Sequence, residues 1–332
     1  MYKKVKHLLS VLVSNKVHPF ELKQLQDILQ SESAVDSSYL ILIFASCAIA
    51  TFGLLSNSTA VIIGAMIIAP LMLPIRGLAY GALEGNVYLF RTASRAVSLG
   101  SAIAIGLAWI IGLLSGISSY GSEILARSQP NLLDLGIAIV AGGISGYAKV
   151  QPKIENSLAG TAIAVALMPP LCVIGLGLAQ ADWSLSLGAT LLYLTNLLGI
   201  TLSCMVSFFI NGYTPVKQAR KALGWVFAFT GILVIPLSLS FISLVQQTRL
   251  QANIKKAFLN KTLTFQEVQL VKTETNWLVN PPEIRLTVRS KKSLTPKQVG
   301  FLEDFINEQM NAKYQLVVEI PQIEEVRKQK KS

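Results

Sequence analysis

The chain has 332 residues, of which 52% are hydrophobic and only 14% charged, and its mean hydropathy is +0.52. Soluble domains carry about 25% charged residues. Only 14 charged residues fall between positions 37 and 245. This segment is too apolar for a soluble fold, so we expect a mainly α polytopic membrane protein whose surroundings are the lipid bilayer.

Residues 1–36 are expected to form an amphipathic helical N-terminal arm. Apolar residues recur at helical spacing between Val5 and Leu12 and again between Leu22 and Leu29. Pro19 suits the first turn of the second helix. The two helices could pack on each other, on a neighbouring subunit or on the bilayer surface, and simple packing is favoured.

Residues 37–245 are expected to hold seven transmembrane helices, because about 20 apolar residues cross the hydrocarbon. The expected spans are 37–56, 59–83, 96–118, 131–148, 157–180, 184–210 and 222–245. The fourth has the shortest charge-free stretch, and it could cross, tilt or form a re-entrant segment.

Basic residues gather in alternate loops of this arrangement. Such asymmetry predicts a protein of the cell membrane with a cytoplasmic N-terminus. It also explains the net charge of +11 without a nucleic-acid partner. Seven spans would put the tail outside, whereas Arg249, Lys255 and Lys256 argue for the inside, and both alternatives stay open.

Two segments suggest an internal repeat. "PLMLPIRGLA" (70–79) and "PLCVIGLGLA" (170–179) share five of ten residues at an offset of 100, and Asn57 and Asn156 each precede a proline run. Three spans per copy is an odd number, so the copies would form a 3+3 inverted repeat. In many secondary transporters, interrupted helices at corresponding positions of such repeats mark the binding site.

Proline pairs interrupt both segments, at Pro70 and Pro74 and at Pro169 and Pro170. Proline lacks an amide donor and opens the helix. The freed backbone groups must face protein or a watery cavity. We therefore expect broken helices near the midplane that line a path, with kinked packing helices as the alternative.

Arg76 is the charged residue beside the first break. A charge at mid-depth costs at least about 2.5 kcal/mol, so Arg76 should snorkel, line the path or pair with Asp134 or Glu84. The candidate path residues are Asn57, Gly64, Pro70, Pro74, Arg76, Asp134, Asn156, Pro169 and Pro170.

Residues 246–332 are expected to form a small soluble α+β domain with a basic tail. A helix at 249–260, strands at 266–275, 283–290 and 315–321, and a helix from Pro296 give the order α-β-β-α-β. In 283–290, apolar residues alternate with polar ones, as in a half-buried strand. Regulation or subunit assembly would suit this domain.

No catalytic constellation is recognised. "GISG" (143–146) has the form of an intramembrane serine protease motif, but the histidines, His7 and His18, lie in the arm and supply no base near it. No ligand spacing indicates a metal, and no phosphate-binding loop appears. We expect neither an enzyme nor a cofactor.

"GLLSNSTAVIIGAMIIAPLMLPIRGLAYGALEGN" (53–86) and "ENSLAGTAIAVALMPPLCVIGLGLAQAD" (155–182) resemble the two hallmarks of domain of unknown function 389. That family comprises uncharacterised hydrophobic membrane proteins of bacteria and archaea. The resemblance covers roughly residues 40–210 and implies an integral membrane protein, often with soluble extensions. It assigns no substrate and no active residues.

The sequence thus predicts a transporter or channel for a small solute or ion. The alternative is a membrane scaffold or sensor that acts through its C-terminal domain. Glycine stripes and two soluble appendages favour a homo-oligomer.

Overall fold

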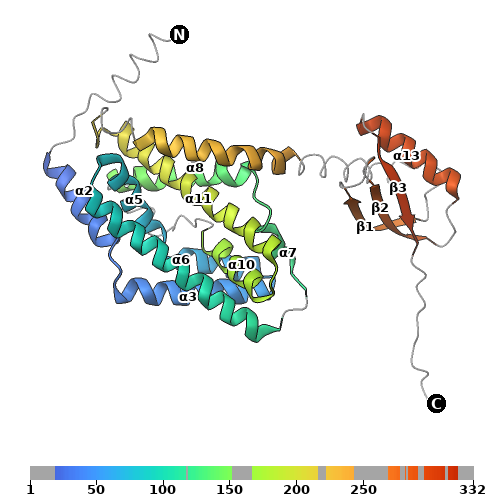
Figure 1. Cartoon of the computed structure of the whole chain (residues 1–332), viewed down its shortest axis with the longest axis horizontal. Helices are drawn as coiled ribbons and strands as arrows, with labels where there is room; N and C mark the ends of the chain where they lie inside the picture. Colours follow the sequence, from blue (N-terminus) through green and yellow to red (C-terminus); the bar gives the residue numbers. More distant parts are fainter. Residues whose placement is uncertain are drawn as a thin grey trace, which may run out of the picture. The chain divides into compact units, whose positions relative to one another are not determined.

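The computed structural model describes residues 19–116, 119–151, 167–215, 222–242, 268–276, 281, 283–290, 295–310 and 313–320. The chain divides into two compact units, Met1–Phe241 and Ile242–Ser332. The first is helical, and the second contains a sheet (Figure 1). The helix expected around Val5 and the one expected at 249–260 lie outside the described residues.

Five helices of the first unit are long and apolar enough to cross a membrane. They are α3 (Ser37–Leu55), α6 (Val87–Ser115), α8 (Leu132–Val150), α11 (Trp183–Ile210) and the helix Ala222–Ile242. A sixth span arises if α4 (Thr59–Ile68) and α5 (Met72–Glu84), which are bent by 52° at a short break, count as one. These helices mark a multi-pass membrane protein.

The second expected span is broken, as its prolines predict. The observed bounds correct other expected spans, and α6 begins at Val87 instead of residue 96. The expected fourth span is the continuous 19-residue helix α8. Of the expected span 157–180, the structure describes only α10 (Met168–Ala179).

Polar caps explain where the long helices begin. Asp36, Asn86 and Asp182 each accept a hydrogen bond from the amide three residues on, and Asn131 forms a reciprocal capping box with Asp134. Such side chains bond amides that have no partner inside the helix. Asn86 therefore allows α6 to start before its two arginines, which are exposed on its first turns.

The segments α3, α4–α5 and α6 run in alternating directions. Tyr39 of α3 donates its hydroxyl to the Ala96 carbonyl of α6, and Cys47 donates to the Ala104 carbonyl further along. Because these contacts advance together along both helices, α3 and α6 are parallel. The chain must return between them, so α4 and α5 together cross in the opposite direction.

The second group of helices repeats this arrangement. Ala138, Gly142 and Gly146 of α8 lie beside Gly199, Ser203 and Ser207 of α11, so α8 and α11 are also parallel. Between α8 and α11 in the chain, the structure describes α10 (Met168–Ala179). It runs parallel to α6, because Gly175 lies beside Ala108 and Ala179 beside Gly112.

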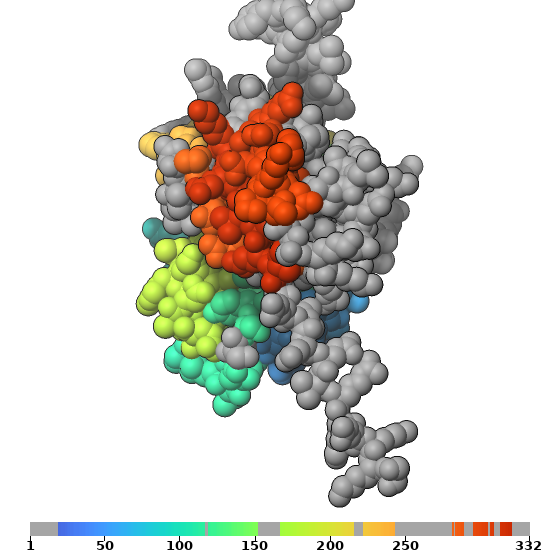
Figure 2. Space-filling view, turned by 90° about the vertical axis from the view of Figure 1, so that its right-hand side faces the viewer, coloured from blue at the N-terminus to red at the C-terminus, as the bar shows by residue number. Residues whose placement is uncertain are grey.

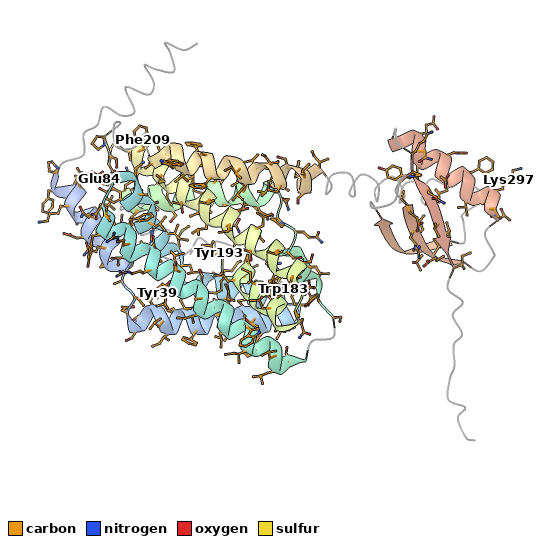
Figure 3. The ribbon with its side chains drawn as sticks, in the orientation of Figure 1. Tyr39, Glu84, Trp183, Tyr193, Phe209 and Lys297 are labelled. Atoms are coloured by element: carbon orange, nitrogen blue, oxygen red, sulfur yellow. The ribbon has the colours of Figure 1, made fainter. Side chains whose placement is uncertain are left out.

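Helix α11 lies at the centre of the helical unit, and 72% of an apolar 18-residue stretch of it is buried. Tyr80 of α5 contacts Phe208 of α11 edge-on, with ring centroids 5.4 Å apart. The thiols of Cys47 and Cys172 lie 3.7 Å apart in the core. Figure 3 shows Tyr39, Glu84 and Phe209 toward one end of the unit and Trp183 toward the other.

The C-terminal unit is a three-stranded sheet with one described helix. β1 (Val268–Asn276) pairs antiparallel with β2 (Glu283–Ser290), and β2 pairs parallel with β3 (Gln315–Glu319). α13 (Pro296–Met310) connects the parallel pair. Its own core contains Ile284, Leu286, Val288, Leu302, Ile306, Tyr314 and Leu316. In Figure 2 its described residues, orange to red, form one contiguous body.

Candidate functional site

The break between α4 and α5 is caused by Pro70. Ala69 adopts an extended conformation with φ −63° and ψ 121°, as expected of a residue before proline. Its amide still bonds the Ala65 carbonyl, and the Leu73 amide bonds the Pro70 carbonyl across the turn. Ten residues of α4 rise about 15 Å, half the hydrocarbon thickness of about 30 Å. The break is therefore about half a hydrocarbon thickness from the start of α4.

Pro74 plays a different part from Pro70. It is the third residue of α5, where the amide has no partner within the helix in any case. Of the two prolines expected to break the span, Pro70 does break the helix, whereas Pro74 is accommodated in the first turn of α5. Pro74 is buried, as is Pro70.

The second proline pair begins α10. Pro169 and Pro170 occupy its first turn, and every residue from Met168 to Gly177 is buried. Asn156, the other candidate in this segment, lies outside the described residues, as does the chain from 152 to 166.

Corresponding helices in the two halves of the unit start 96 residues apart, whereas the sequence comparison used an offset of 100 residues. α5 starts at Met72 and α10 at Met168, and their following helices are capped by Asn86 and Asp182. Gly85 and Ala181 stand just before these caps, both with positive φ. At this offset Pro74 corresponds to Pro170. The pairing of Pro70 with Pro170 does not match the elements.

Arg76 has a partner that the sequence did not suggest. Its Nη2 lies 3.5 Å from Oε2 of Glu32, the last residue of α2 (Pro19–Glu32). The other oxygen, Oε1, is 2.7 Å from Nζ of Lys149 at the end of α8. One carboxylate from the N-terminal arm therefore joins two cations on different membrane helices.

Neither expected partner of Arg76 was right. Asp134 accepts a hydrogen bond from the Asn131 amide at 2.8 Å, in the first turn of α8, whereas Lys149 lies in its last turn. Glu84 ends α5 and makes no ion pair with Arg76 within the described chain. No local pattern could indicate Glu32, because a loop and two helices separate it from Arg76.

Helix α2 lies directly against α5. A Cβ atom at Gly77 would overlap the Ser33 hydroxyl and approach the Leu29 carbonyl to 3.3 Å. Leu25 and Leu29 are buried in the same core. Burial, with the nearby Glu21, raises the pKa of Tyr213, which follows α11. α2 is thus an integral part of this end of the helical unit.

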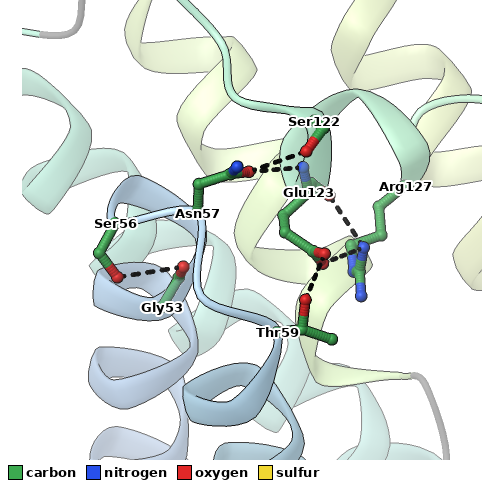
Figure 4. Close-up of polar contacts among 7 residues, drawn as sticks. All are labelled: Gly53, Ser56, Asn57, Thr59, Ser122, Glu123 and Arg127. Atoms are coloured by element: carbon green, nitrogen blue, oxygen red, sulfur yellow. Dashed lines mark hydrogen bonds and ion pairs between the residues drawn. The ribbon is translucent and has the colours of Figure 1, made fainter.

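Asn57 belongs to a structural cluster at the other end (Figure 4). Its side-chain oxygen accepts hydrogen bonds from the Ser122 hydroxyl and the Glu123 amide at the start of α7 (Ser122–Ala126). Glu123 also binds Thr59 and forms an ion pair with Arg127 at 2.7 Å. These contacts fix the α3–α4 turn against α7 and explain Asn57 without a role in a path.

Gly64 lies on α4, partly exposed, and a Cβ atom there would meet nothing within 4 Å. Packing against the described residues therefore gives no reason for glycine at this position. In the described part of the chain, no three side chains of His, Cys, Asp or Glu gather as metal ligands would.

In the described part of the chain, these features define a multi-pass membrane protein with a broken span and a partly buried three-residue ion cluster. Residues 66–202 match the family described as domain of unknown function (DUF389), so the resemblance drawn from the sequence is confirmed over this segment.

A relative named as uncharacterised, from Methanocaldococcus jannaschii, is 28% identical over 223 residues, which are 64% of this chain and 69% of that protein. No solved structure matches. Neither the family description nor the relative's name states a function.

Proposed function

We propose that this protein is a transporter or channel for a small solute or ion. The observation that carries the proposal is the break at Ala69–Leu71 in the helix pair α4–α5, which connects the parallel helices α3 and α6. We place this break near mid-depth, because α4 is about half as long as the hydrocarbon is thick. A packing helix gains nothing from such a break, whereas a substrate site gains backbone groups that are free to bind.

The N-termini of the half-helices support the same proposal. α3, α6, α8 and α11 begin with polar side chains that bond their first amides. α5 and α10 begin after Leu71 and Leu167, and the side chain of leucine has no acceptor atom. Two positive helix ends thus lie inside the unit without a capping side chain from the described residues, as at the substrate sites of transporters with broken helices.

The 96-residue offset supports an inverted repeat. α3, α5 and α6 would correspond to α8, α10 and α11. The parallel pairs α3–α6 and α8–α11 then run in opposite directions, because α10 is parallel to α6 and turns directly into α11. With the helix Ala222–Ile242 this gives seven crossings.

We further propose that the end of the unit that holds α2 faces the cytoplasm of a cell membrane. Arg91 and Arg95 begin α6 at this end and Lys149 ends α8 there. At the other end, Arg127 is balanced by its ion pair with Glu123. Excess basic residues mark the cytoplasmic side.

The test is solute flux into proteoliposomes, screened over inorganic ions and small organic acids. Pro70→Ala should reduce flux to background while the protein stays folded, because the backbone can then close into a continuous helix. Pro74→Ala is the matched control and should retain flux, because Pro74 lies in a helical turn that needs no amide there.

Two results would contradict the proposal. The first is a folded wild-type protein that moves no solute across the panel. The second is a Pro70→Ala variant with wild-type flux, which would favour the scaffold or sensor alternative, because that alternative needs no break.

A further inference from the structure

Arg76 is largely buried and, among the described residues, incompletely paired. Its side chain is 13% exposed, and its ion-pair contact with Glu32 measures 3.5 Å. Its Nε and the Glu32 Oε2 make no hydrogen bond within the described residues. A structural arginine of this burial normally binds its carboxylate through two short parallel hydrogen bonds. Here the edge of the guanidinium group that carries Nε has no acceptor in the described part of the chain.

Lys149 completes a geometry that suits an oxyanion. Its side chain is 5% exposed, and its Nζ lies 2.7 Å from Glu32 Oε1. The single Glu32 carboxylate therefore spans the space between a guanidinium group on α5 and an ammonium group on α8. Any carboxylate or phosphate group placed there would have the same two cations available, and Arg76 could bind it bidentately.

The present occupant of this space is tethered outside the membrane helices. Glu32 ends α2, the helix that precedes the first apolar helix α3. Arg76 is the fifth residue of α5, about one turn past the break. The carboxylate of the arm thus meets the broken span close to the point at which the path was proposed.

We propose that Arg76 and Lys149 form a binding site for an oxyanion, either carboxylate or phosphate, and that Glu32 occupies this site as a tethered competitor until the anion arrives. That the anion is also the transported solute rests on the proposed function. Binding of the anion releases Glu32 from both cations, and with it the contact of α2 with α5 and α8.

The experiment measures equilibrium binding of radiolabelled inorganic phosphate and of succinate to the purified full-length chain in detergent. Glu32→Gln removes the competing charge and should tighten binding by about tenfold or more, as expected for a close charge pair. Arg76→Gln should abolish binding in the wild-type and in the Glu32→Gln background.

Glu123→Gln is the matched control. It neutralises a carboxylate of similar burial, 18% exposed against 20% for Glu32, in an ion pair at the other end of the unit. It should leave both affinities within about twofold of the wild type. Glu32→Asp serves if Glu32→Gln does not fold, because it keeps the charge but is too short to reach both cations. It should also tighten binding.

The source of the anion is distinguished by repeating the measurement in vesicles of phosphatidylcholine alone and of phosphatidylcholine with phosphatidylglycerol. Equal phosphate binding in both identifies a soluble anion as the ligand. Loss of phosphate binding only with phosphatidylglycerol identifies a lipid headgroup phosphate. Both results support the oxyanion site.

The proposal is overturned if folded Glu32→Gln or Glu32→Asp binds phosphate and succinate no more tightly than the wild type, or if Arg76→Gln retains binding. These results are independent of flux. Binding that depends on Arg76 without any flux would refute transport and leave the anion site, whereas flux with unchanged binding in Arg76→Gln would refute the site alone.

Discussion

Gly175→Ala perturbs the contact that holds α10 against α6. A Cβ atom at this position would overlap the Ile105 carbonyl oxygen and lie 2.8 Å from both the Ala108 Cβ and the Trp109 amide nitrogen. Two of these three atoms are helix backbone, so no side-chain rotation can relieve the overlap. The substitution must move one helix away from the other.

The expected cost follows from comparison with a glycine that has room. Overpacking a tight contact costs about 1–3 kcal/mol, while alanine stabilises a helix interior by about 0.5–1 kcal/mol relative to glycine. Gly106→Ala in α6 is the matched control, because a Cβ atom there meets nothing within 4 Å. Both variants gain the stabilisation of alanine over glycine in a helix interior. The difference between their free energies of unfolding therefore isolates the packing cost of about 1–3 kcal/mol.

Thermal unfolding in one detergent, followed by tryptophan fluorescence, measures this difference. Apparent midpoints at a fixed heating rate are compared, because such proteins often unfold irreversibly. One kcal/mol corresponds to about 2–4 °C in a protein of 150–250 residues, so Gly175→Ala should melt about 2–12 °C below Gly106→Ala. If the two midpoints coincide, or if Gly175→Ala melts higher, α10 does not pack on α6 as described.

Two further variants test other parts of the chain. Asn57→Ala should lower the stability of the helical unit by about 1–2 kcal/mol, because it removes the acceptor for α7 and places alanine at φ 51°. Asn57→Gly relieves the φ strain, and wild-type stability of that variant would show that the hydrogen bonds contribute nothing. Leu286→Ala should cost the C-terminal unit about 2–5 kcal/mol, because Leu286 is fully buried in that unit's own core. Limited proteolysis should then cleave this unit first. The exposed Arg285→Ala should not have this effect, and equal cleavage of the two variants would contradict the assigned core.

Much of the helical unit could be predicted because apolar stretches and prolines act locally. The expected spans at 37–56 and 184–210 agree with α3 and α11 to within one residue. Pro70 predicts the break directly, because a missing donor and a steric clash depend only on the neighbouring backbone. The expected start of the third span at residue 96 is wrong, because Arg91 and Arg95 predict a loop, whereas α6 begins at Val87 and carries both arginines exposed on its first turns.

The ion cluster could not be predicted in the same way. Glu32, Arg76 and Lys149 come from three helices, and no spacing rule relates them. By charge alone, Asp134 and Glu84 are equal candidates for the ion-pair partner of Arg76. Asp134 was already bonded locally, in the capping box of its own helix, and a capping contact costs less to form than one across the fold.

Which segments are apolar enough for lipid, where Pro70 breaks a span and that an amphipathic strand-and-helix unit follows can all be predicted from the sequence. These properties depend on hydropathy, proline geometry and alternation, which act over a few residues. The parallel directions of α3 and α6 and of α8 and α11, and the position of Glu32 between Arg76 and Lys149, become visible only in the folded structure. Helix direction and ion pairing depend on contacts between distant segments, which form only when the helices pack.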